Sequence, residues 1–363
     1  WPTAESEMAS SSSNVRSALL FCHPSMEGLA EHIAKKCCAA NSETFIPVVT
    51  PVSPFSFAES AAEQRRVKKF QQVQFVKTIQ WDKFKDGWPN LFIDKVRECA
   101  GRDVIFLGSF HSPEVVFEQL SIIYHMPRYL ARSFKFILPY FPTGTMERID
   151  TEGQVATAKV LAMLLSAIPS TARGPAQIVM FDIHALPERF YFSDQVIPRL
   201  ESAIPLLVKE IFNMPDDVQA NLSVAYPDEG AFKRFNHMFE GFPSILCTKI
   251  RDGDQRIVSI KEGETFGRHV IIIDDLIQTG GTLINCAKLL QKHRALSVNA
   301  FVTHAVFPEH SWKRFTEGDV KLDTFWITDS IPHAKHIAQH PPFKLLSLGD
   351  AISETLLSYD LKE

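Results

Sequence analysis

The chain has 363 residues, of which 45% are hydrophobic and 22% are charged, and its formal net charge is −4. This length is enough for two domains, each with its own core. The composition argues against a basic nucleic-acid-binding surface, and no apolar run reaches the roughly 18 residues that a membrane span needs. The six cysteines form no CxxC pair, so we expect buried thiols in a reducing compartment.

The first half of the chain alternates short apolar runs with helix-like segments, which is typical of α/β proteins with mostly parallel strands. Strands are predicted at 17–22, 103–107, 134–138 and 177–182. Helices are predicted at 26–38, 112–124 and 154–165. Residues 1–15 are predicted to be disordered, and 49–78 to be an insertion or an irregular loop.

A similar alternation of short apolar runs and helix-like segments begins after Pro205. Strands are predicted at 221–225, 244–247, 269–274, 297–303 and 321–328, and helices at 283–293 and 350–361. We therefore predict an N-terminal domain at 16–198 and a C-terminal domain at 199–363, after the disordered segment 1–15. The predicted fold class is α/β, with a mostly parallel sheet flanked by helices in each domain.

The most informative motif is VIIIDDLIQTGGTL at 270–283. Its β-branched run predicts a buried strand, which leads into Asp274 and Asp275 and then the loop TGGT at 279–282. Backbone N–H groups around the glycines, together with the N-terminus of the next helix, can bind a phosphomonoester. The adjacent carboxylates can accept hydrogen bonds from two vicinal ribose hydroxyls. The alternative is a tight strand-to-helix turn with an Asp cap.

Three further segments carry charged groups that suit phosphoryl transfer. Asp182 and His184 stand at a strand end, where alternation predicts that both face the same way and can hold a metal ion. Lys249 and Arg251 follow a strand and can supply cationic charge to a moving phosphoryl group. Asp228 lies in a Pro-Asp turn after another strand, although such turns are common.

Together these sequence motifs resemble those of the ribose-phosphate diphosphokinases, and they are most similar to the class II, plant-type branch of that family. The similarity is carried by the segments WDKFKDGWPNLFI at 81–93, ILPYFPTGTMER at 137–148 and DIHALPERFYFSD at 182–194. The resemblance implies two tandem phosphoribosyltransferase-like domains. It also implies transfer of the diphosphate of ATP to C1 of ribose 5-phosphate, which gives phosphoribosyl pyrophosphate and AMP for nucleotide biosynthesis.

The resemblance further implies Mg2+ as the cofactor, ATP and ribose 5-phosphate as the ligands, and a homo-oligomer whose active site is shared between subunits. No nucleic acid or membrane partner is expected. The predicted location is cytoplasmic, with a plastid as the alternative.

Each matched residue takes a role from the family. Catalysis is expected from Lys249, Arg251 and His184, and metal binding from Asp182, His184 and Asp194. Substrate binding is expected from Asp228, Asp274, Asp275, Gln278, Thr279, Gly280, Gly281 and Thr282. ATP is expected to contact Phe84 and Asp86 from an adjacent subunit, and also Arg148.

Four positions depart from the class I branch of the family and match class II. Trp88 and Gln278 replace a Glu and an Asp, Arg148 is the one plausible cation after the strand end at 140–141, and Ser193 replaces an Asp. These changes put in doubt a strict requirement for ATP and the regulation by phosphate and ADP.

Two alternatives stay open at this point. The first is a phosphoribosyltransferase that consumes phosphoribosyl pyrophosphate, and the duplicated architecture argues against it. The second is a non-catalytic homologue that regulates the synthetase, and the intact Lys249, Arg251 and acidic pair argue against that.

Overall fold

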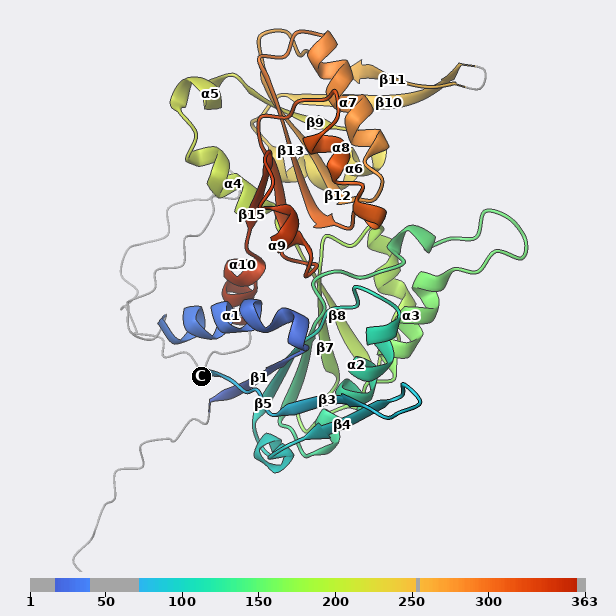
Figure 1. Ribbon diagram of the computed structural model, residues 1–363, viewed down its shortest axis with the longest axis vertical. Coiled ribbons are helices and arrows are strands. Elements are labelled where there is room, and N and C mark those ends of the chain that lie inside the picture. The colour runs from blue at the N-terminus through green and yellow to red at the C-terminus, as the bar shows by residue number, and fades with distance from the viewer. Residues whose placement is uncertain (1–16, 40–71, 253–254, 358–363) are drawn as a thin grey trace, which may run out of the picture.

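The computed structural model describes residues 17–39, 72–252 and 255–357, and for 249–252 and 255–257 it describes the backbone alone. Two sheets, one from each half of the chain, follow one another along the long axis of the molecule (Figure 1). The predicted disordered segment 1–15 and most of the predicted irregular segment 49–78 lie outside the described residues. The last part of 49–78 is described, and it contributes a short strand to the first sheet.

The first sheet has six parallel strands in the order β2-β1-β5-β6-β7-β8. These strands are β1 (Ala18–Cys22), β2 (Val73–Phe75), β5 (Asp103–Leu107), β6 (Ser133–Ile137), β7 (Ala176–Phe181) and β8 (Val196–Glu201). The helices of this half are α1 (Glu27–Ala39), α2 (Glu114–His125) and α3 (Thr157–Ser166). Every residue of β1 and β5 is buried, which explains why their sequences are continuous apolar runs rather than alternating ones.

A separate hairpin, β3 (Ile79–Lys83) and β4 (Pro89–Ile93), packs beside α2. Its Trp88 ring meets Phe117 of α2 edge to face at 5.2 Å. The turn of the hairpin is therefore anchored on the N-terminal domain. The segment 81–93, which carries part of the family resemblance, is this hairpin.

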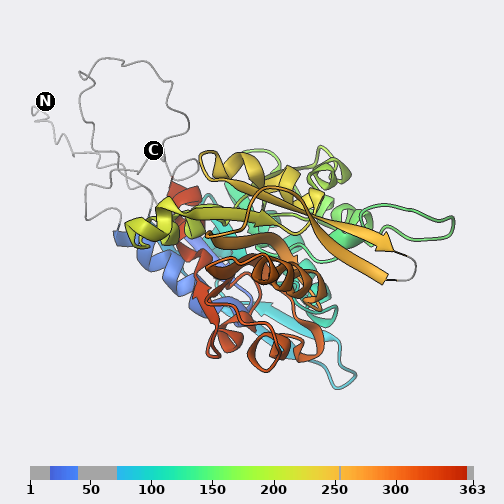
Figure 2. The same cartoon turned by 90° about the horizontal axis from the view of Figure 1, so that it is seen from above.

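The second sheet has seven strands in the order β11-β10-β9-β12-β13-β14-β15. All its neighbours are parallel except β10 and β11. Its strands are β9 (Leu222–Tyr226), β10 (Ser244–Asp252), β11 (Gln255–Glu262), β12 (His269–Ile277), β13 (Ser297–Ala305), β14 (Phe325–Thr328) and β15 (Phe343–Leu346). Strands β10 and β11 extend past the body of the domain as a ribbon (Figure 2).

The helices of the second half are α4 (Ile204–Phe212), α5 (Asp216–Ala220), α6 (Glu229–Phe235), α7 (Gly281–Lys292), α8 (Lys313–Thr316), α9 (Ala334–Ile337) and α10 (Leu348–Thr355). Short 3-10 helices lie at Pro24–Met26, Val96–Cys99, Met126–Arg128, Gly144–Met146, Leu186–Tyr191, Asn236–Phe239 and Pro308–His310. No helix in the described part of the chain is long and apolar enough to cross a membrane.

The two halves share one continuous part of the core. Helix α10, from the end of the second half, packs on α1 of the first. Oδ1 of Asp350 on α10 lies 2.8 Å from Nε2 of His32 and 2.9 Å from Nζ of Lys36. A Cβ at Gly349 would lie 2.5 Å from the His32 ring, so the helices approach closely because this residue is a glycine.

The predicted α/β class with two mostly parallel sheets is confirmed. β5 has the predicted bounds, whereas β12 runs three residues past its predicted end because its pairing with β13 continues to Ile277. The first sheet continues to Glu201 in β8, so it includes residues on both sides of the proposed boundary at 198. Neither the β3–β4 hairpin nor the β10–β11 ribbon was predicted from the sequence.

Candidate active site

Strand β12 presents the acidic pair to both sides of the second sheet, because successive residues of a strand point to opposite faces. Asp275 is 1% exposed, and Asp274 is half-buried. The TGGT loop follows, and α7 begins at Gly281 within it. The loop and the carboxylates thus lie at the carboxyl end of a central strand, where α/β proteins bind ligands.

The conformation of the loop depends on glycine. Gly280 has a φ of 78°, and a Cβ there would lie 2.6 Å from the Phe315 ring. This left-handed backbone next to an aromatic wall excludes other residues. The predicted glycine loop between strand and helix is therefore present, and its binding of a phosphate stays a prediction.

Two residues after β13 form hydrogen bonds with the TGGT loop and with the residue before it. The hydroxyl of Ser311 donates to the carbonyl of Gln278 at 2.9 Å, and the guanidinium of Arg314 donates to the carbonyl of Thr279 at 2.6 Å. Both acceptors are carbonyl groups, so these two bonds do not use the N–H groups of the loop.

Asp275 is the centre of a charged cluster that joins the two halves of the chain. Its Oδ2 lies 2.8 Å from Nδ1 of His184, and its Oδ1 lies 2.6 Å from Nη1 of Arg234. Burial acts to raise the pKa of Asp275, but His184 and Arg234 outweigh it and hold the pKa well below its usual range. The hydrogen bond to Asp275 in turn raises the pKa of His184. Asp275 is therefore ionised in the folded chain.

Asp274 has the opposite electrostatic environment. Burial and the negative charges of Asp275 and Asp228 raise its pKa well above the usual value. Asp228 is the N-cap of α6, and its Oδ1 accepts a bond from the N–H of Ala231 at 3.0 Å. Two neighbouring carboxyl groups of one strand are thus driven toward different protonation states.

Arg234 is a charged member of this cluster that was not predicted from the sequence. It lies on α6 in the helix that Asp228 caps, and its side chain is largely buried. The available signal was a cation on the helix that follows the Pro-Asp turn. That signal is weak, since Lys233 stands beside it in the sequence.

The strand alternation from which Asp182 and His184 were expected to face the same way does not apply, because β7 ends at Phe181. Asp182 has a φ of 37°, which interrupts the strand alternation. Its Oδ1 accepts a bond from the Ser202 hydroxyl at 2.6 Å, and its Oδ2 accepts bonds from the Ala203 N–H at 2.8 Å and the Thr303 hydroxyl at 2.6 Å. Burial raises the pKa of Asp182. Asp182 therefore ties the end of β7 to the inter-domain connection and to β13.

Asp194 does not join the cluster. It is exposed, in the turn that precedes β8. Because β8 is parallel to β7 and pairs with it along its length, Asp194 lies at the amino edge of the sheet, while His184 follows the carboxyl edge. The length of a six-residue strand, roughly 20 Å, separates the two edges. The expected metal site of Asp182, His184 and Asp194 is therefore not assembled in this structure.

Lys249 and Arg251 lie on β10, where their backbones pair with Val258 and Arg256 of β11. They are thus part of the β10–β11 ribbon rather than of an irregular loop. The side chains of both residues lie outside the described part of the chain.

Two of the three residues expected to contact ATP, Phe84 and Asp86, lie away from the acidic pair. Phe84 and Asp86 form the exposed turn of the β3–β4 hairpin, and Figure 1 shows this hairpin on the flank of the N-terminal domain remote from β12. Arg148 is exposed and pairs with Asp150 at 3.2 Å. Its segment reaches the cluster through Gly144, where a Cβ would lie 3.1 Å from Cβ of His184.

One buried carboxyl group near His184 was not expected. Glu188 is 1% exposed, and burial raises its pKa to about 8. Apart from the Ala185 N–H, which acts to lower that pKa, its oxygens have no hydrogen-bond partner in the described part of the chain. Glu188 is therefore mostly neutral at pH 7.

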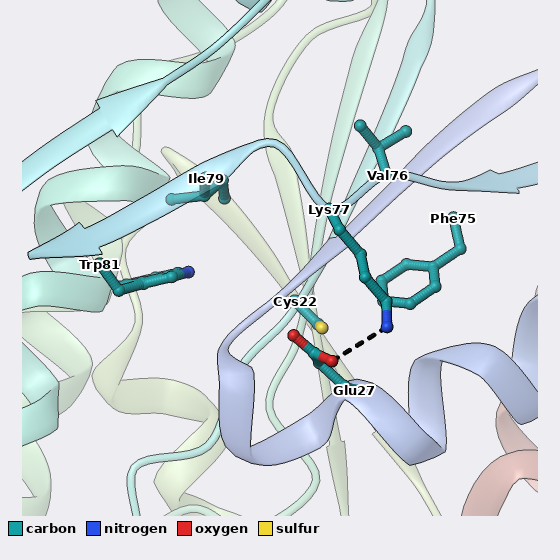
Figure 3. A pocket seen from close by; sticks show the side chains of 7 residues that line it. All are labelled: Cys22, Glu27, Phe75, Val76, Lys77, Ile79 and Trp81. Carbon is teal, nitrogen blue, oxygen red and sulfur yellow. Dashed lines mark hydrogen bonds and ion pairs between the residues drawn. The ribbon is translucent and has the colours of Figure 1, made fainter.

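Two cavities lie outside this cluster. A cavity of about 70 Å³ at the edge of the first sheet is lined by Cys22, Trp81 and an ion pair of Lys77 with Glu27 at 3.0 Å (Figure 3). A cavity of about 440 Å³ lies between the halves, with Tyr140 on one side and the segment 306–312 on the other. The acidic pair lines neither of them.

The cluster contains carboxylates, the ligand type that hard divalent cations prefer. Asp275 contacts His184, and Asp274 lies near enough to Asp275 and Asp228 for their charges to raise its pKa. The mutual repulsion that raises the pKa of Asp274 would be relieved by a divalent cation. Among the described residues, no group of three or more His, Cys, Asp or Glu is already arranged around a metal position.

Comparison with known proteins assigns the family. The model of the N-terminal domain of ribose phosphate pyrophosphokinase matches residues 19–168, and the phosphoribosyl transferase domain model matches 191–344. The chain is 48% identical to Ribose-phosphate pyrophosphokinase 3, mitochondrial, of Spinacia oleracea, over 88% of this chain and 79% of that protein. It is 52% identical to Ribose-phosphate pyrophosphokinase 3, chloroplastic, of Arabidopsis thaliana, over 77% of this chain and 69% of that protein.

The fold is shared with a solved structure. The phosphoribosylpyrophosphate synthetase from Mycobacterium smegmatis superposes with a TM-score of 0.71, over 94% of this chain and 98% of that one, at 21% identity. Fold and site together are those of a protein with two phosphoribosyltransferase-like domains. The chain belongs to the ribose-phosphate pyrophosphokinase family, as its motifs indicated.

Proposed function

We propose that the chain is a ribose-phosphate diphosphokinase, which transfers the diphosphate of ATP to C1 of ribose 5-phosphate and releases AMP. The observation that carries the proposal is the acidic pair at the carboxyl end of β12, beside the TGGT loop and paired with His184 across the domain boundary. The loop suits the 5-phosphate, and the pair suits the ribose hydroxyls.

The reaction needs positioning and charge more than covalent chemistry. The anomeric hydroxyl attacks the β-phosphorus in line, a new P–O bond forms, and the bond between the β-phosphorus and the bridging oxygen of AMP breaks. Backbone N–H groups at 279–282 hold the 5-phosphate. Asp274 accepts a hydrogen bond from a ribose hydroxyl, and Lys249 and Arg251 neutralise the transferring group.

We propose Mg2+ as the cofactor, held by His184 through its free Nε2 and by Asp228. When bound, Mg2+ neutralises the phosphate oxygens of ATP. Asp275 orients the imidazole through Nδ1 and stays ionised through Arg234. We assign no metal to Asp182, because both of its oxygens already accept hydrogen bonds, and none to Asp194, which lies at the opposite edge of the first sheet.

We further propose that the subunits complete one another's sites. The exposed turn with Phe84 and Asp86 is remote from β12 of its own chain, which fits a contact with ATP bound to a neighbouring subunit. Arg148, exposed beside the Gly144 segment, is the cation of this chain proposed for the nucleotide.

An activity assay tests the proposed reaction. Purified chain with ATP, ribose 5-phosphate and Mg2+ should form AMP and phosphoribosyl pyrophosphate in equal amounts, and omission of any one component should stop both. A phosphoribosyltransferase would instead need phosphoribosyl pyrophosphate and a base, and a non-catalytic homologue would form no AMP.

The location proposed is the cytoplasm, with a plastid as the alternative. Two relatives carry the words mitochondrial and chloroplastic in their names. Imaging of the full natural protein with a C-terminal fluorescent tag distinguishes these compartments.

A further inference from the structure

Two buried thiols are in contact beneath the candidate active site. The sulfur atoms of Cys247 and Cys286 lie 3.5 Å apart, and neither residue is exposed. Cys247 lies on β10 shortly before Lys249, and Cys286 lies on α7, the helix that begins in the TGGT loop. Both belong to the apolar core of the second domain and are free thiols.

Their mutual hydrogen bond makes the two thiols chemically different. The bond from Cys286 lowers the pKa of Cys247 in spite of burial. The same bond raises the pKa of Cys286, as do burial and the nearby charges of Cys247, Asp274 and Asp228. Cys247 is thus the thiol of the pair that loses its proton more readily. By contrast, burial raises the pKa of Cys99, in the first domain, to about 11.

We propose that Cys247 and Cys286 form an oxidation site for peroxide-class oxidants, and that the disulfide they form slows diphosphate transfer. In the first step the Cys247 thiolate attacks a peroxide oxygen, the O–O bond breaks, and water leaves after it takes up the thiol proton. In the second step the sulfur of Cys286 attacks the resulting sulfenic acid, the S–O bond breaks, and a second water leaves. Two thiols are oxidised, and one hydrogen peroxide is reduced to two waters.

The backbone around Cys247 can accommodate the bond. A disulfide needs sulfur atoms at about 2.05 Å, so the pair must approach by roughly 1.5 Å. Side-chain rotation supplies part of this, and strand β10 can supply the rest. Its pairing with β11 shifts register between Leu246 and Cys247, and such irregularities bend a strand and interrupt its ladder.

The disulfide would join two elements that the reaction uses. β10 carries Lys249 and Arg251, and α7 begins at the phosphate loop. A covalent link between them fixes the distance from the cations to the bound sugar phosphate, which is the geometry that in-line transfer depends on. We expect oxidation to lower kcat fivefold or more, with full recovery after a thiol reductant. The expected loss of kcat rests on the proposed function, whereas disulfide formation does not.

A peptide map of the unaltered full-length chain tests the site itself. The chain is treated with hydrogen peroxide, alkylated under denaturing conditions and digested without reduction. The expected result is one cross-linked species that contains Cys247 and Cys286, two hydrogen masses below the sum of its peptides. Alkylated Cys247 and Cys286 at an oxidant dose that modifies the exposed Cys38 would overturn the proposal. This outcome is independent of whether the chain makes AMP.

Matched variants test the effect on the reaction. Cys286→Ala, which cannot form the disulfide, should keep its activity under reducing conditions and should not show the fivefold, dithiothreitol-reversible loss of kcat after peroxide. Cys99→Ala, which removes a buried thiol of the other domain, should behave like the unaltered chain. If the cross-link forms in the unaltered chain without change in kcat, the regulatory half is overturned. If the reduced chain forms no AMP, the proposed function fails, while the peptide map still decides the oxidation site.

Discussion

His184 and Asp275 lie on different halves of the chain, and their side chains meet with Nδ1 and Oδ2 2.8 Å apart. This contact fixes which imidazole nitrogen is free and brings the segment after β7 to the end of β12. The acidic pair therefore consists of two electrostatically different groups: Asp275, which contacts His184 and Arg234, and Asp274, whose pKa is raised.

The first prediction compares the two carboxylates of the pair. In the metal-free chain, Asp275→Asn should lower the free energy of unfolding by about 3 kcal/mol, because it leaves Arg234 and His184 without their buried partner. Asp274→Asn should change it by less than about 1 kcal/mol, because the raised pKa favours the neutral acid that Asn mimics. Denaturant unfolding at pH 7 measures both. Equal losses would contradict the assigned charge states.

The stability that the contact between Asp275 and His184 contributes should fall at both low and high pH. The lowered pKa of Asp275 means that its contribution is present above pH 3.8 and is lost as the pH falls. The raised pKa of His184 means that its contribution is full below pH 6.5 and is lost as the pH rises through the folded value. The difference between unaltered chain and Asp275→Asn should be largest from about pH 4.5 to 6.5. A difference that grows steadily to pH 9 would be inconsistent with this account.

The second prediction separates a structural from a metal-binding role at Asp182. Asp182→Ala removes the acceptor of three hydrogen bonds and should cost about 2–4 kcal/mol of unfolding free energy. The Mg2+ concentration for half-maximal activity should stay within twofold of the unaltered value. His184→Ala is the comparison, and it should raise this concentration at least tenfold. A similar rise for Asp182→Ala would restore Asp182 as a ligand.

The third prediction tests the cations of β10. Lys249→Ala should lower kcat by 100-fold or more with little change in the affinity for ribose 5-phosphate, because the charge acts on the transferring group. Lys261→Ala on the adjacent strand is the control. Lys261 forms an exposed ion pair with Glu229 at 2.8 Å, which should contribute little. Unchanged kcat in Lys249→Ala would remove its proposed role.

The fourth prediction concerns the buried Glu188. Its pKa is raised from 4.5 to about 8, so the folded state binds its proton more strongly than the unfolded state does. Stability is full below pH 4.5 and falls as the pH rises to 8. Glu188→Gln cannot ionise, and at pH 7 it should recover at most about 3 kcal/mol.

Thermal unfolding from pH 5 to 8 measures this effect. Glu188→Gln should show a shallower fall of Tm with pH than the unaltered chain. The exposed Glu152→Gln should leave the profile unchanged. Parallel profiles for all three chains would show that Glu188 is not buried in its neutral form.

Local sequence patterns located most of the secondary structure and the glycine loop at 279–282, because these depend on neighbouring residues. The bounds of β5 and the glycine at 280 are examples. The interaction of His184 with Asp275 could not be predicted, since it depends on how the two sheets dock. The strand alternation at Asp182 failed because one positive φ angle ends β7 a residue early.

The most direct test of the account follows the phosphorus atoms of ATP. Chain, Mg2+ and ribose 5-phosphate are incubated with ATP labelled at either the α or the β phosphorus, and the products are separated. Diphosphate transfer predicts that the β label moves entirely to phosphoribosyl pyrophosphate and the α label stays in AMP. Recovery of the β label in ADP, or in unreacted ATP alone, would contradict the account.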